Sequence, residues 1–418
     1  MAVAVVITFV GVLVFLSHAL VGVFNRIGIP DVLWLLLIGI AIGPGLHLIT
    51  PQQFGSVGPV FNTVTLILII FESSLGLRLR DIKVALPGTA SLTISSFIAV
   101  TLVVGALGLA LHLGLWQAAI LGVILGGNSP TVVVPLIKGL PLDSASGNIL
   151  FLESVIGDVV SIAICLALLQ AGLMPHTHAS ALVGGIAASF AVATVAGGLA
   201  GVVWAAVLKR MRRLENALFT TPACVFVVYG ASQILGLNGA VATLAFGIVL
   251  GNIEGLNAAL AKRHISTVTL NEVEKIFFSE VVFLLKTFFF VYIGLNVQLT
   301  HWLWVSGGAL IALLLLVARV PAVFATVRHS VPARDATYMA MMIPKGLAAA
   351  VLAGIVVQQN LPQGVLIENL VYSALFFSIV FTSVLVFIVR RTPIGGALER
   401  VFAWGQKPRA VPAATNAA

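Results

Sequence analysis

Two carboxylic acids lie inside one long apolar segment of the sequence. Glu153 and Asp158 belong to Phe-Leu-Glu-Ser-Val-Ile-Gly-Asp (151–158), within the apolar stretch 146–171. A carboxylate in the middle of a membrane costs about 2.5 kcal/mol or more, so it usually faces a water-filled cavity, an ion path or a partner charge. These two acids therefore mark the part of the sequence where we expect chemistry.

The apolar segment before these acids is interrupted. Gly-Gly-Asn-Ser-Pro-Thr (126–131) lies inside the apolar stretch 116–138, where glycine and proline would cost a helix backbone hydrogen bonds. Non-helical backbone at membrane depth is tolerated only where it is buried in protein or lines a cavity. Broken backbone beside buried acids is how secondary transporters form a cation site near the midplane of the membrane.

Asp158 is the strongest candidate for binding a cation. Ser154 lies four residues earlier, so its hydroxyl shares a helix face with the carboxylate. With the Ser129 hydroxyl and the carbonyl oxygens freed around Asn128, these groups form an all-oxygen set that suits a hard monovalent cation. The alternative is a structural carboxylate that caps the broken helix, but Gly157 beside Asp158 leaves room for water and an ion.

Glu153 needs a partner of its own. It lies five residues before Asp158, which is about 140° around a helix, so the two acids point in different directions. Arg319 is buried equally deep, in Leu-Leu-Leu-Leu-Val-Ala-Arg-Val-Pro (313–321), and needs an anion. Because unpaired buried charges are far more costly than paired ones, we predict a structural ion pair between Glu153 and Arg319. A direct role of Glu153 in transport is the less favoured alternative.

Two further ionisable residues lie in apolar segments. Glu72, in Phe-Glu-Ser-Ser-Leu (71–75), could line a cytoplasmic ion path or pair with a basic residue, and the sequence favours neither. Pro344-Lys345-Gly346 interrupts the apolar segment 335–358. Lys345 can place its ammonium against the helix C-terminal carbonyls at this break, where it would offset the dipole of the half-helix. We favour this electrostatic role over proton carriage.

The composition is that of a polytopic membrane protein. The 418 residues are 60% hydrophobic and 9% charged, whereas soluble proteins carry about 25% charged residues. Thirteen segments are long and apolar enough to span or nearly span a bilayer. Their limits are 2–24, 30–48, 59–77, 87–112, 116–138, 146–171, 180–208, 218–235, 238–253, 271–297, 302–327, 335–358 and 365–389. We therefore expect a multi-pass protein of the cell (inner or plasma) membrane, surrounded by the lipid bilayer.

The basic residues indicate the orientation of these segments. Of the 22 Lys and Arg residues, four lie within segments and the other 18 fall in loops or ends on one side of them. Because Lys and Arg mark cytoplasmic loops, the pattern predicts an N-terminus outside and a C-terminus inside. The net charge of +8 follows from this topology and does not indicate a nucleic-acid partner. The tail 392–418 is expected to be a short, disordered cytoplasmic segment.

No motif for nucleotide binding occurs, since no glycine-rich loop follows a strand and no Walker sequence is present. We expect no nucleotide partner, no cofactor and no enzyme activity. The interruptions at Pro130 and Pro344 lie in the fifth and twelfth segments. Interrupted helices at matching positions indicate two inverted repeats, segments 1–6 and 8–13, which segment seven would link.

These features together resemble the monovalent cation/proton antiporters, closest to the prokaryotic sodium/proton exchangers of the NhaP type. Residues 29–45 (Ile-Pro-Asp-Val-Leu-Trp-Leu-Leu-Leu-Ile-Gly-Ile-Ala-Ile-Gly-Pro-Gly) resemble the second helix of that family. Phe-Glu-Ser-Ser-Leu-Gly-Leu (71–77) resembles its Phe-Glu-Gly-Gly-Leu pattern. Residues 237–252 and 288–295 are similar to later helices, so the resemblance covers most of the chain.

The site motifs of the family match in part. The Thr-Asp-Pro of its fifth helix stands here as Asn128-Ser129-Pro130, so one acid is missing. Its Glu-Ser-x-x-Asn-Asp stands as Glu153 to Asp158, with glycine in place of asparagine. Its buried arginine matches Arg319, and its Leu-Arg-Gly resembles Pro344-Lys345-Gly346.

The resemblance implies a six-helix core that moves against a scaffold, and a scaffold that forms a homodimer. Within a transmembrane domain of residues 1–391, the core would comprise about 87–171 and 302–389, and the scaffold about 2–77 and 180–297. The expected function is electroneutral exchange of protons for sodium, or for potassium or lithium, by alternating access around Asp158. Burial disfavours a charged carboxylate, which makes the proton and the cation comparable competitors. The alternative is a gated monovalent cation channel or a non-transporting sensory relative, which the missing acid at Ser129 favours.

Overall fold

The protein is helical throughout the part of the chain that the structure describes. The computed structural model describes residues 8, 11–20, 22, 30–48, 57–77, 79–172, 179–213, 217–255, 269–298 and 301–404. No β-strand occurs among them, which confirms the all-α fold class. The elements in chain order are a helix at Gly11–Leu20, α2 (Asp31–Ile40), the π-helix η1 (Ala41–Gly45), α3 (Val57–Gly76), α4 (Leu79–Ala110), α5 (Leu115–Ile124), α6 (Pro130–Gly139), α7 (Ser144–Gly172), α8 (Ala179–Met211), the 3₁₀-helix η3 (Ala217–Phe219), α9 (Thr220–Ile234), α10 (Gly239–Gly251), α12 (Glu272–Asn296), α13 (Trp302–Thr326), α14 (Ala333–Met341), α15 (Leu347–Gln358), α16 (Gly364–Arg391) and α17 (Pro393–Ala403).

The lengths of these helices suit a membrane. Within the described ranges, seven helices are long and apolar enough to cross a bilayer, and seven shorter apolar helices of 10–17 residues accompany them. The exact number of spans and their orientation stay predictions. Several of the basic residues on which the orientation depends lie outside the described residues, namely Arg26, Arg78, Lys262, Arg263, Lys407 and Arg409.

The predicted break in the fifth segment is present. α5 ends at Ile124, and α6 begins at Pro130 with Ser129 as its extended N-cap residue. Proline suits the first position of a helix, because the N–H that it lacks would have no partner there. The chain between the two half-helices is therefore non-helical, as the glycines and Pro130 predict.

The predicted break in the twelfth segment is present as well. α14 ends at Met341 and α15 begins at Leu347, with extended backbone at Met342 and at the N-cap residue Gly346. The two breaks lie side by side, because the Ser129 N–H donates a hydrogen bond to the Pro344 carbonyl at 3.0 Å.

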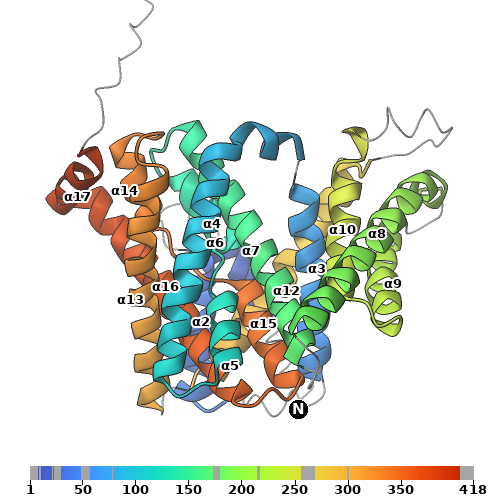
Figure 1. Cartoon of the computed structure of the whole chain (residues 1–418), viewed down its shortest axis with the longest axis horizontal. Helices are drawn as coiled ribbons and strands as arrows, with labels where there is room; N and C mark the ends of the chain where they lie inside the picture. The colour runs from blue at the N-terminus through green and yellow to red at the C-terminus, as the bar shows by residue number, and fades with distance from the viewer. Residues whose placement is uncertain are drawn as a thin grey trace, which may run out of the picture.

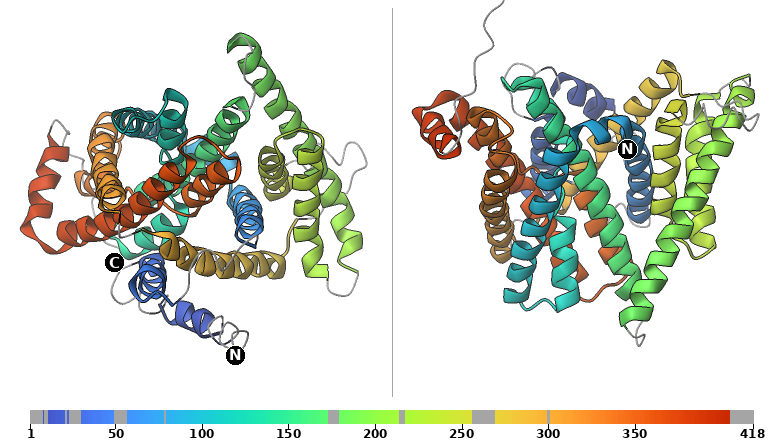
Figure 2. Two further views of the ribbon diagram at one scale, coloured as in Figure 1. Left: turned by 90° about the horizontal axis from the view of Figure 1, so that it is seen from below. Right: turned by 45° about the horizontal axis from the view of Figure 1, so that its top comes forward.

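The long helices assemble in two groups around these breaks. Figure 1 shows α13, α14 and α17 at one end of the molecule and α8, α9 and α10 at the other, and the views in Figure 2 agree. α13 packs against α4 and α16, while α10 packs against α3 and α8. α15 contacts both α3 and α7, so the second broken helix lies where the groups meet. The division into a moving core and a fixed scaffold stays a prediction.

The structure corrects the prediction for the tail. Residues 393–403, which we expected to be disordered, form the helix α17 and pack against α14 and α16. Pro393 starts the helix, and Phe402 is buried with its ring 6.1 Å from that of Phe324 in α13. The prediction rested on the Pro, Ala, Thr and Asn residues at the end of the tail and overlooked the apolar residues Ile394, Leu398, Val401 and Phe402 before them. Residues 405–418 lie outside the described residues.

Candidate functional site

Asp158 lies near the middle of α7, directly beside the break between α5 and α6. A Cβ atom at Gly127 would come within 2.6 Å of the Gly157 carbonyl oxygen, so only glycine at 127 lets the broken segment approach α7 this closely. Ser161 fixes the contact: its hydroxyl accepts a hydrogen bond from the Gly127 N–H at 2.9 Å and donates one to the Val123 carbonyl at 3.0 Å. The break therefore passes α7 at the level of Asp158.

The Asp158 carboxylate is buried, and none of the described residues is a fixed partner for it. The residue is 8% exposed. No hydrogen bond or ion pair engages its carboxylate within the described part of the chain, although the charge of Lys345 attracts it. A buried carboxylate in this condition is stabilised when a proton or a cation neutralises it.

The predicted ion pair between Glu153 and Arg319 is present. Both Glu153 oxygens accept hydrogen bonds from the guanidinium: Oε1 from Nη1, and Oε2 from Nη2 at 2.7 Å. Glu153 is 4% exposed and Arg319 is 1% exposed. A two-point contact of this kind fixes both side chains, which is the geometry that an arginine and a carboxylate favour. The pair joins α7 to α13.

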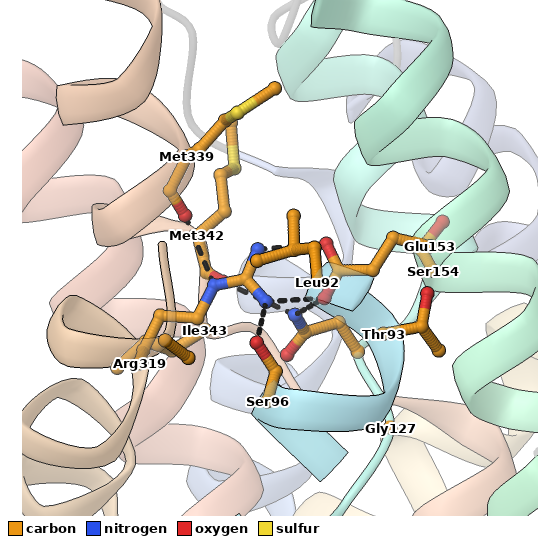
Figure 3. A network of polar contacts seen from close by, with 12 residues as sticks. Leu92, Thr93, Ser96, Gly127, Glu153, Ser154, Arg319, Met339, Met342 and Ile343 are labelled. Carbon is orange, nitrogen blue, oxygen red and sulfur yellow. Dashed lines mark hydrogen bonds and ion pairs between the residues drawn. The ribbon is translucent and has the colours of Figure 1, made fainter. Parts of the chain in front are cut away.

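Two further donors of Arg319 also have partners. Its Nε donates to the Met339 carbonyl of α14 at 3.1 Å, and its Nη1 donates to the Ser96 hydroxyl of α4 at 3.0 Å. Figure 3 shows the guanidinium between Met339, Ser96 and Glu153, with Gly127 on the chain nearby. Four helices therefore meet at one buried arginine, which supports the structural role that the sequence predicts.

Asn128 connects this ion pair to Lys345. Its Nδ2 donates to Glu153 Oε1 and to the Met342 carbonyl, each at 3.3 Å. Its Oδ1 accepts a hydrogen bond from the Lys345 ammonium at 3.0 Å, and the Gly127 carbonyl accepts another at 2.8 Å. The freed oxygens around Asn128, which we assigned to a cation, thus accept hydrogen bonds from the lysine ammonium. Their role as cation ligands stays a prediction.

Lys345 binds the other broken helix, not its own. We expected its ammonium to contact carbonyls at the break of the twelfth segment, but the carbonyl that it contacts belongs to Gly127, just beyond the end of α5. The reason is that the two breaks lie side by side, in contact through the Ser129 N–H and the Pro344 carbonyl. The physical role is the expected one, because a cation lies at the C-terminal end of a half-helix.

Two serine hydroxyls near the break have local partners. Ser154 Oγ donates to the Phe151 carbonyl of its own helix at 2.7 Å, and Ser129 Oγ shares a hydrogen bond with Thr131 Oγ1 at 2.7 Å. Each hydroxyl oxygen keeps lone pairs that can bind a cation. Both residues are buried, so Asp158, Ser154 and Ser129 remain candidate ligands.

Glu72 belongs to a different charged cluster. It lies in α3, where the charge of Lys286 in α12 attracts it. The ammonium of Lys286 makes an ion pair with Asp31 of α2 at 2.8 Å, and both side chains are largely buried. The sequence left Lys286 without a partner and did not single out Asp31. The signal that could have identified Asp31 is its position after Pro30, inside the apolar segment 30–48.

Sequence reasoning also missed Ser96 and Ser161. Each is a single hydroxyl in an apolar helix, and nothing in the spacing marks its partner. Only the packing of α4 against α13, and of α5 against α7, brings these hydroxyls to the Arg319 guanidinium and the Gly127 amide.

The charges at the site sum to zero when every group is ionised. Glu153 and Arg319 cancel each other, as do Asp158 and Lys345. A proton or a monovalent cation on Asp158 adds one positive charge in either case. The site can therefore bind either a proton or a monovalent cation, and its net charge is the same with either one bound.

Comparisons with known proteins agree with this geometry. The family model of the transmembrane sodium/hydrogen exchanger matches residues 11–391. A K(+)/H(+) antiporter, NhaP2 of Shewanella sp. (strain ANA-3), is 26% identical over 241 residues, which cover 55% of this chain and 41% of the relative. The match thus spans about two fifths of the length of that curated relative.

Solved structures show the same fold. The sodium proton antiporter MjNhaP1 from Methanocaldococcus jannaschii at pH 8 has a TM-score of 0.73 at 20% identity, with 96% of this chain and 99% of that chain covered. A map of the same antiporter from electron microscopy gives a TM-score of 0.67 at 20% identity, covering 98% and 100%. The expected resemblance is therefore confirmed. Because the family model matches nearly the whole chain, this multi-pass membrane protein belongs to the transmembrane sodium/hydrogen exchanger family.

Proposed function

We propose that the protein is a secondary active antiporter that exchanges protons for a monovalent cation across the membrane. The observation that carries the proposal is the contrast within α7, where Glu153 accepts hydrogen bonds from Arg319 and Asn128, whereas no described residue pairs with the Asp158 carboxylate. Membership of the exchanger family supports it. The relative NhaP2 is named for potassium and MjNhaP1 for sodium, so sodium, potassium and lithium are the cations to test.

Asp158 is the group for which the two substrates compete. The ligands proposed for the cation are its carboxylate and the hydroxyl oxygens of Ser154 and Ser129, with Glu72 as a further carboxylate on the cytoplasmic path. Pro130 and Pro344 keep the neighbouring backbone non-helical, and Lys345 offsets the half-helix end at Gly127. Hard monovalent cations prefer oxygen ligands of this kind.

The exchange is proposed to be electroneutral. Gly157 cannot titrate, Ser129 stands where the resembled family has an acid, and Glu153 is already paired with Arg319. Asp158 is then the carboxylate at the site that changes charge during the cycle. One negative charge is neutralised by one proton or by one monovalent cation, so both legs of the cycle carry the same net charge.

Alternating access is the proposed mechanism, and a cavity between the two helix groups supports it. The cavity has a volume of about 260 Å³ and lies between α7 and α15 on one side and α3, α9 and α10 on the other. Leu166 on its wall is eight residues beyond Asp158 in α7, which is roughly 12 Å along a helix. We propose that α7 and α15 move with the core, and that the scaffold forms a homodimer within the bilayer.

The test uses the purified protein in proteoliposomes. Proton efflux is followed after addition of sodium, potassium or lithium, with the membrane potential clamped by valinomycin in the sodium and lithium experiments. We expect exchange at a rate that does not change with the clamped voltage, since a transported net charge would feel about 2.3 kcal/mol per 100 mV. A steady rate that shifts with voltage would exclude one-for-one exchange.

The second candidate is a gated cation channel, or a non-transporting relative on the same scaffold. The observation in its favour is Ser129, which stands where the resembled family has an acid. The same proteoliposomes separate the candidates. A channel passes the cation without stoichiometric proton movement, and a non-transporting protein gives neither flux.

A further inference from the structure

The C-terminal helix α17 lies beside the helix bundle, where α16 ends. Thr392 has extended backbone and Pro393 begins α17, so the chain changes direction directly after Arg391. Figure 1 shows α17 at the edge of the molecule, next to α14. The left view of Figure 2 shows α17 lengthwise, while α13 is seen nearly end-on. α17 therefore runs across the direction of the spanning helices.

One side of α17 is fixed to the protein. Gly395 and Phe402 are seven residues apart, so they share a helix face, and both are buried. A Cβ atom at Gly395 would lie 2.2 Å from the Val389 carbonyl oxygen, so α17 packs directly against the end of α16. At its other end, the Arg328 guanidinium donates a hydrogen bond to the Trp404 carbonyl at 3.3 Å. These contacts determine which side of α17 faces away from the bundle.

The side that faces away is apolar. Ile394 and Val401, which are also seven residues apart, are each more than half exposed, and Trp404 is 77% exposed. α16 shows the same property shortly before it ends, because Val384 and Phe387 are exposed there. Exposed apolar residues that gather on a spanning protein mark contact with lipid, and tryptophan is enriched where the membrane meets water.

Arginine residues accompany this apolar side. Arg391 is the last residue of α16, and Arg400 directly precedes Val401 in α17. Both are exposed, and no hydrogen bond or ion pair engages either side chain within the described ranges. The sequence 390–409 carries five basic residues and one acidic residue, namely Arg390, Arg391, Arg400, Lys407 and Arg409 against Glu399. The end of the chain is thus strongly positive where the apolar side of α17 is exposed.

The combination of these features indicates more than orientation. Basic residues at the ends of spanning helices are common in membrane proteins and by themselves mark only the cytoplasmic side. A helix that lies across the spanning direction, with exposed apolar residues and adjoining arginines, is typical of a helix in the membrane interface. The partner whose charge complements such a helix is an anionic phospholipid.

We propose that α17 is an interfacial helix that binds anionic phospholipids of the cytoplasmic leaflet. Ile394, Val401 and Trp404 enter the boundary between headgroups and acyl chains, while Arg391 and Arg400 bind lipid phosphate groups. Arginine suits this role because its guanidinium can donate two parallel hydrogen bonds to one phosphate. The cytoplasmic side follows from the predicted topology. The lipid site is separate from the exchange site at Asp158 and does not depend on it.

The experiment detects which lipid lies next to Trp404. The purified full-length protein is reconstituted into vesicles of phosphatidylcholine and phosphatidylglycerol, in which one lipid or the other carries bromine near the glycerol end of an acyl chain. Bromine quenches tryptophan fluorescence on contact, and the share of Trp404 is the difference between the wild type and Trp404→Phe. At equal mole fraction, brominated phosphatidylglycerol should quench Trp404 more strongly than brominated phosphatidylcholine. This preference should weaken as salt is added, because salt screens exposed charges.

A double variant tests the arginines. Arg391→Gln with Arg400→Gln should lower the preference for phosphatidylglycerol by about fivefold for each arginine removed. The matched control is Arg210→Gln with Arg213→Gln at the end of α8, at the other end of the molecule (Figure 1), which removes the same charge and should keep the wild-type preference. Gel filtration checks that each variant is folded, and the salt dependence of the wild type decides the matter if the double variant is not.

Three results would overturn the proposal. Equal quenching by the two brominated lipids in the wild type would show that α17 does not select anionic lipid. A preference that is insensitive to salt, or that survives the loss of both arginines, would show that their charges do not bind the lipid. Quenching of Trp404 by neither lipid would show that protein covers this side of α17.

Discussion

Glu153 and Asp158 lie five residues apart in α7, are both almost fully buried, and have opposite surroundings. Glu153 accepts hydrogen bonds from both ends of the Arg319 guanidinium and from Asn128. Asp158 accepts no hydrogen bond from the described residues, and only the positive charge of Lys345 attracts it. Of two buried carboxylates in the same helix, one is thus held by partners and the other is open to a proton or a cation.

This difference separates a structural acid from a functional one. A buried charge with a complete set of partners gains nothing from a substrate, and removing a partner strands its counter-charge. A buried charge without a partner is stabilised by anything that neutralises it, and a proton and a small cation both do so. The predictions below ask whether the two acids of α7 differ in this way.

The largest effect is expected at Asp158. Asp158→Asn keeps the shape of the side chain and removes its charge, so cation-dependent proton exchange should be lost entirely while the protein stays folded and membrane-inserted. The measurement is proton efflux from proteoliposomes, with circular dichroism and gel filtration of the purified variant as controls for folding. If the folded variant still exchanges protons for cations, Asp158 is not part of the exchange site.

The next effect concerns stability at Glu153. Arg319→Ala leaves a buried carboxylate without its cation, and we expect a loss of about 3–5 kcal/mol in the free energy of unfolding. The readout is thermal unfolding in detergent. Adding Glu153→Gln should recover part of the loss, because the stranded charge disappears. Losses that simply add in this double-mutant cycle would show that the two residues are not coupled.

A smaller effect is expected at Lys345. Lys345→Gln removes a positive charge that opposes a cation on Asp158, so the apparent KM for the cation should fall when both proteins are assayed at the same near-neutral pH. The expected gain in binding free energy is about 1–2 kcal/mol, which is the size of the interaction between unit charges about 8–15 Å apart at an effective dielectric near 20. Lys345→Arg, which keeps the charge, is the matched control. A KM that rises or stays constant in Lys345→Gln would contradict the electrostatic role.

The fold was largely predictable because a membrane restricts the alternatives. Apolar length identifies spans, and Pro130 and Pro344 identify the breaks, since each removes a backbone donor where helix continuation needs one. The pairing of Glu153 with Arg319 was predictable for a related reason: two isolated charges in apolar segments need each other. Each of these inferences rests on a single proline or charged residue in an otherwise apolar segment.

The details that depend on tertiary contacts were not predictable. Lys345 contacts the Gly127 carbonyl and not its own break, because the two breaks lie side by side, and nothing in the sequence shows this contact. Asp31 and Ser96 have partners on distant helices for the same reason. The helix α17 was missed because its stability comes from docking against α14, which composition does not report.

The central claim is that one carboxylate, Asp158, holds either a proton or a cation. The most direct test adds sodium or lithium to the purified protein in weakly buffered detergent solution and measures proton release with a pH-sensitive dye, alongside cation binding by calorimetry. We predict one proton released for each cation bound by the wild type and by Glu72→Gln, and none released by Asp158→Asn. Proton release by Asp158→Asn that equals that of the wild type would contradict this claim. So would the release of two protons per cation by the wild type, if Glu72→Gln releases only one.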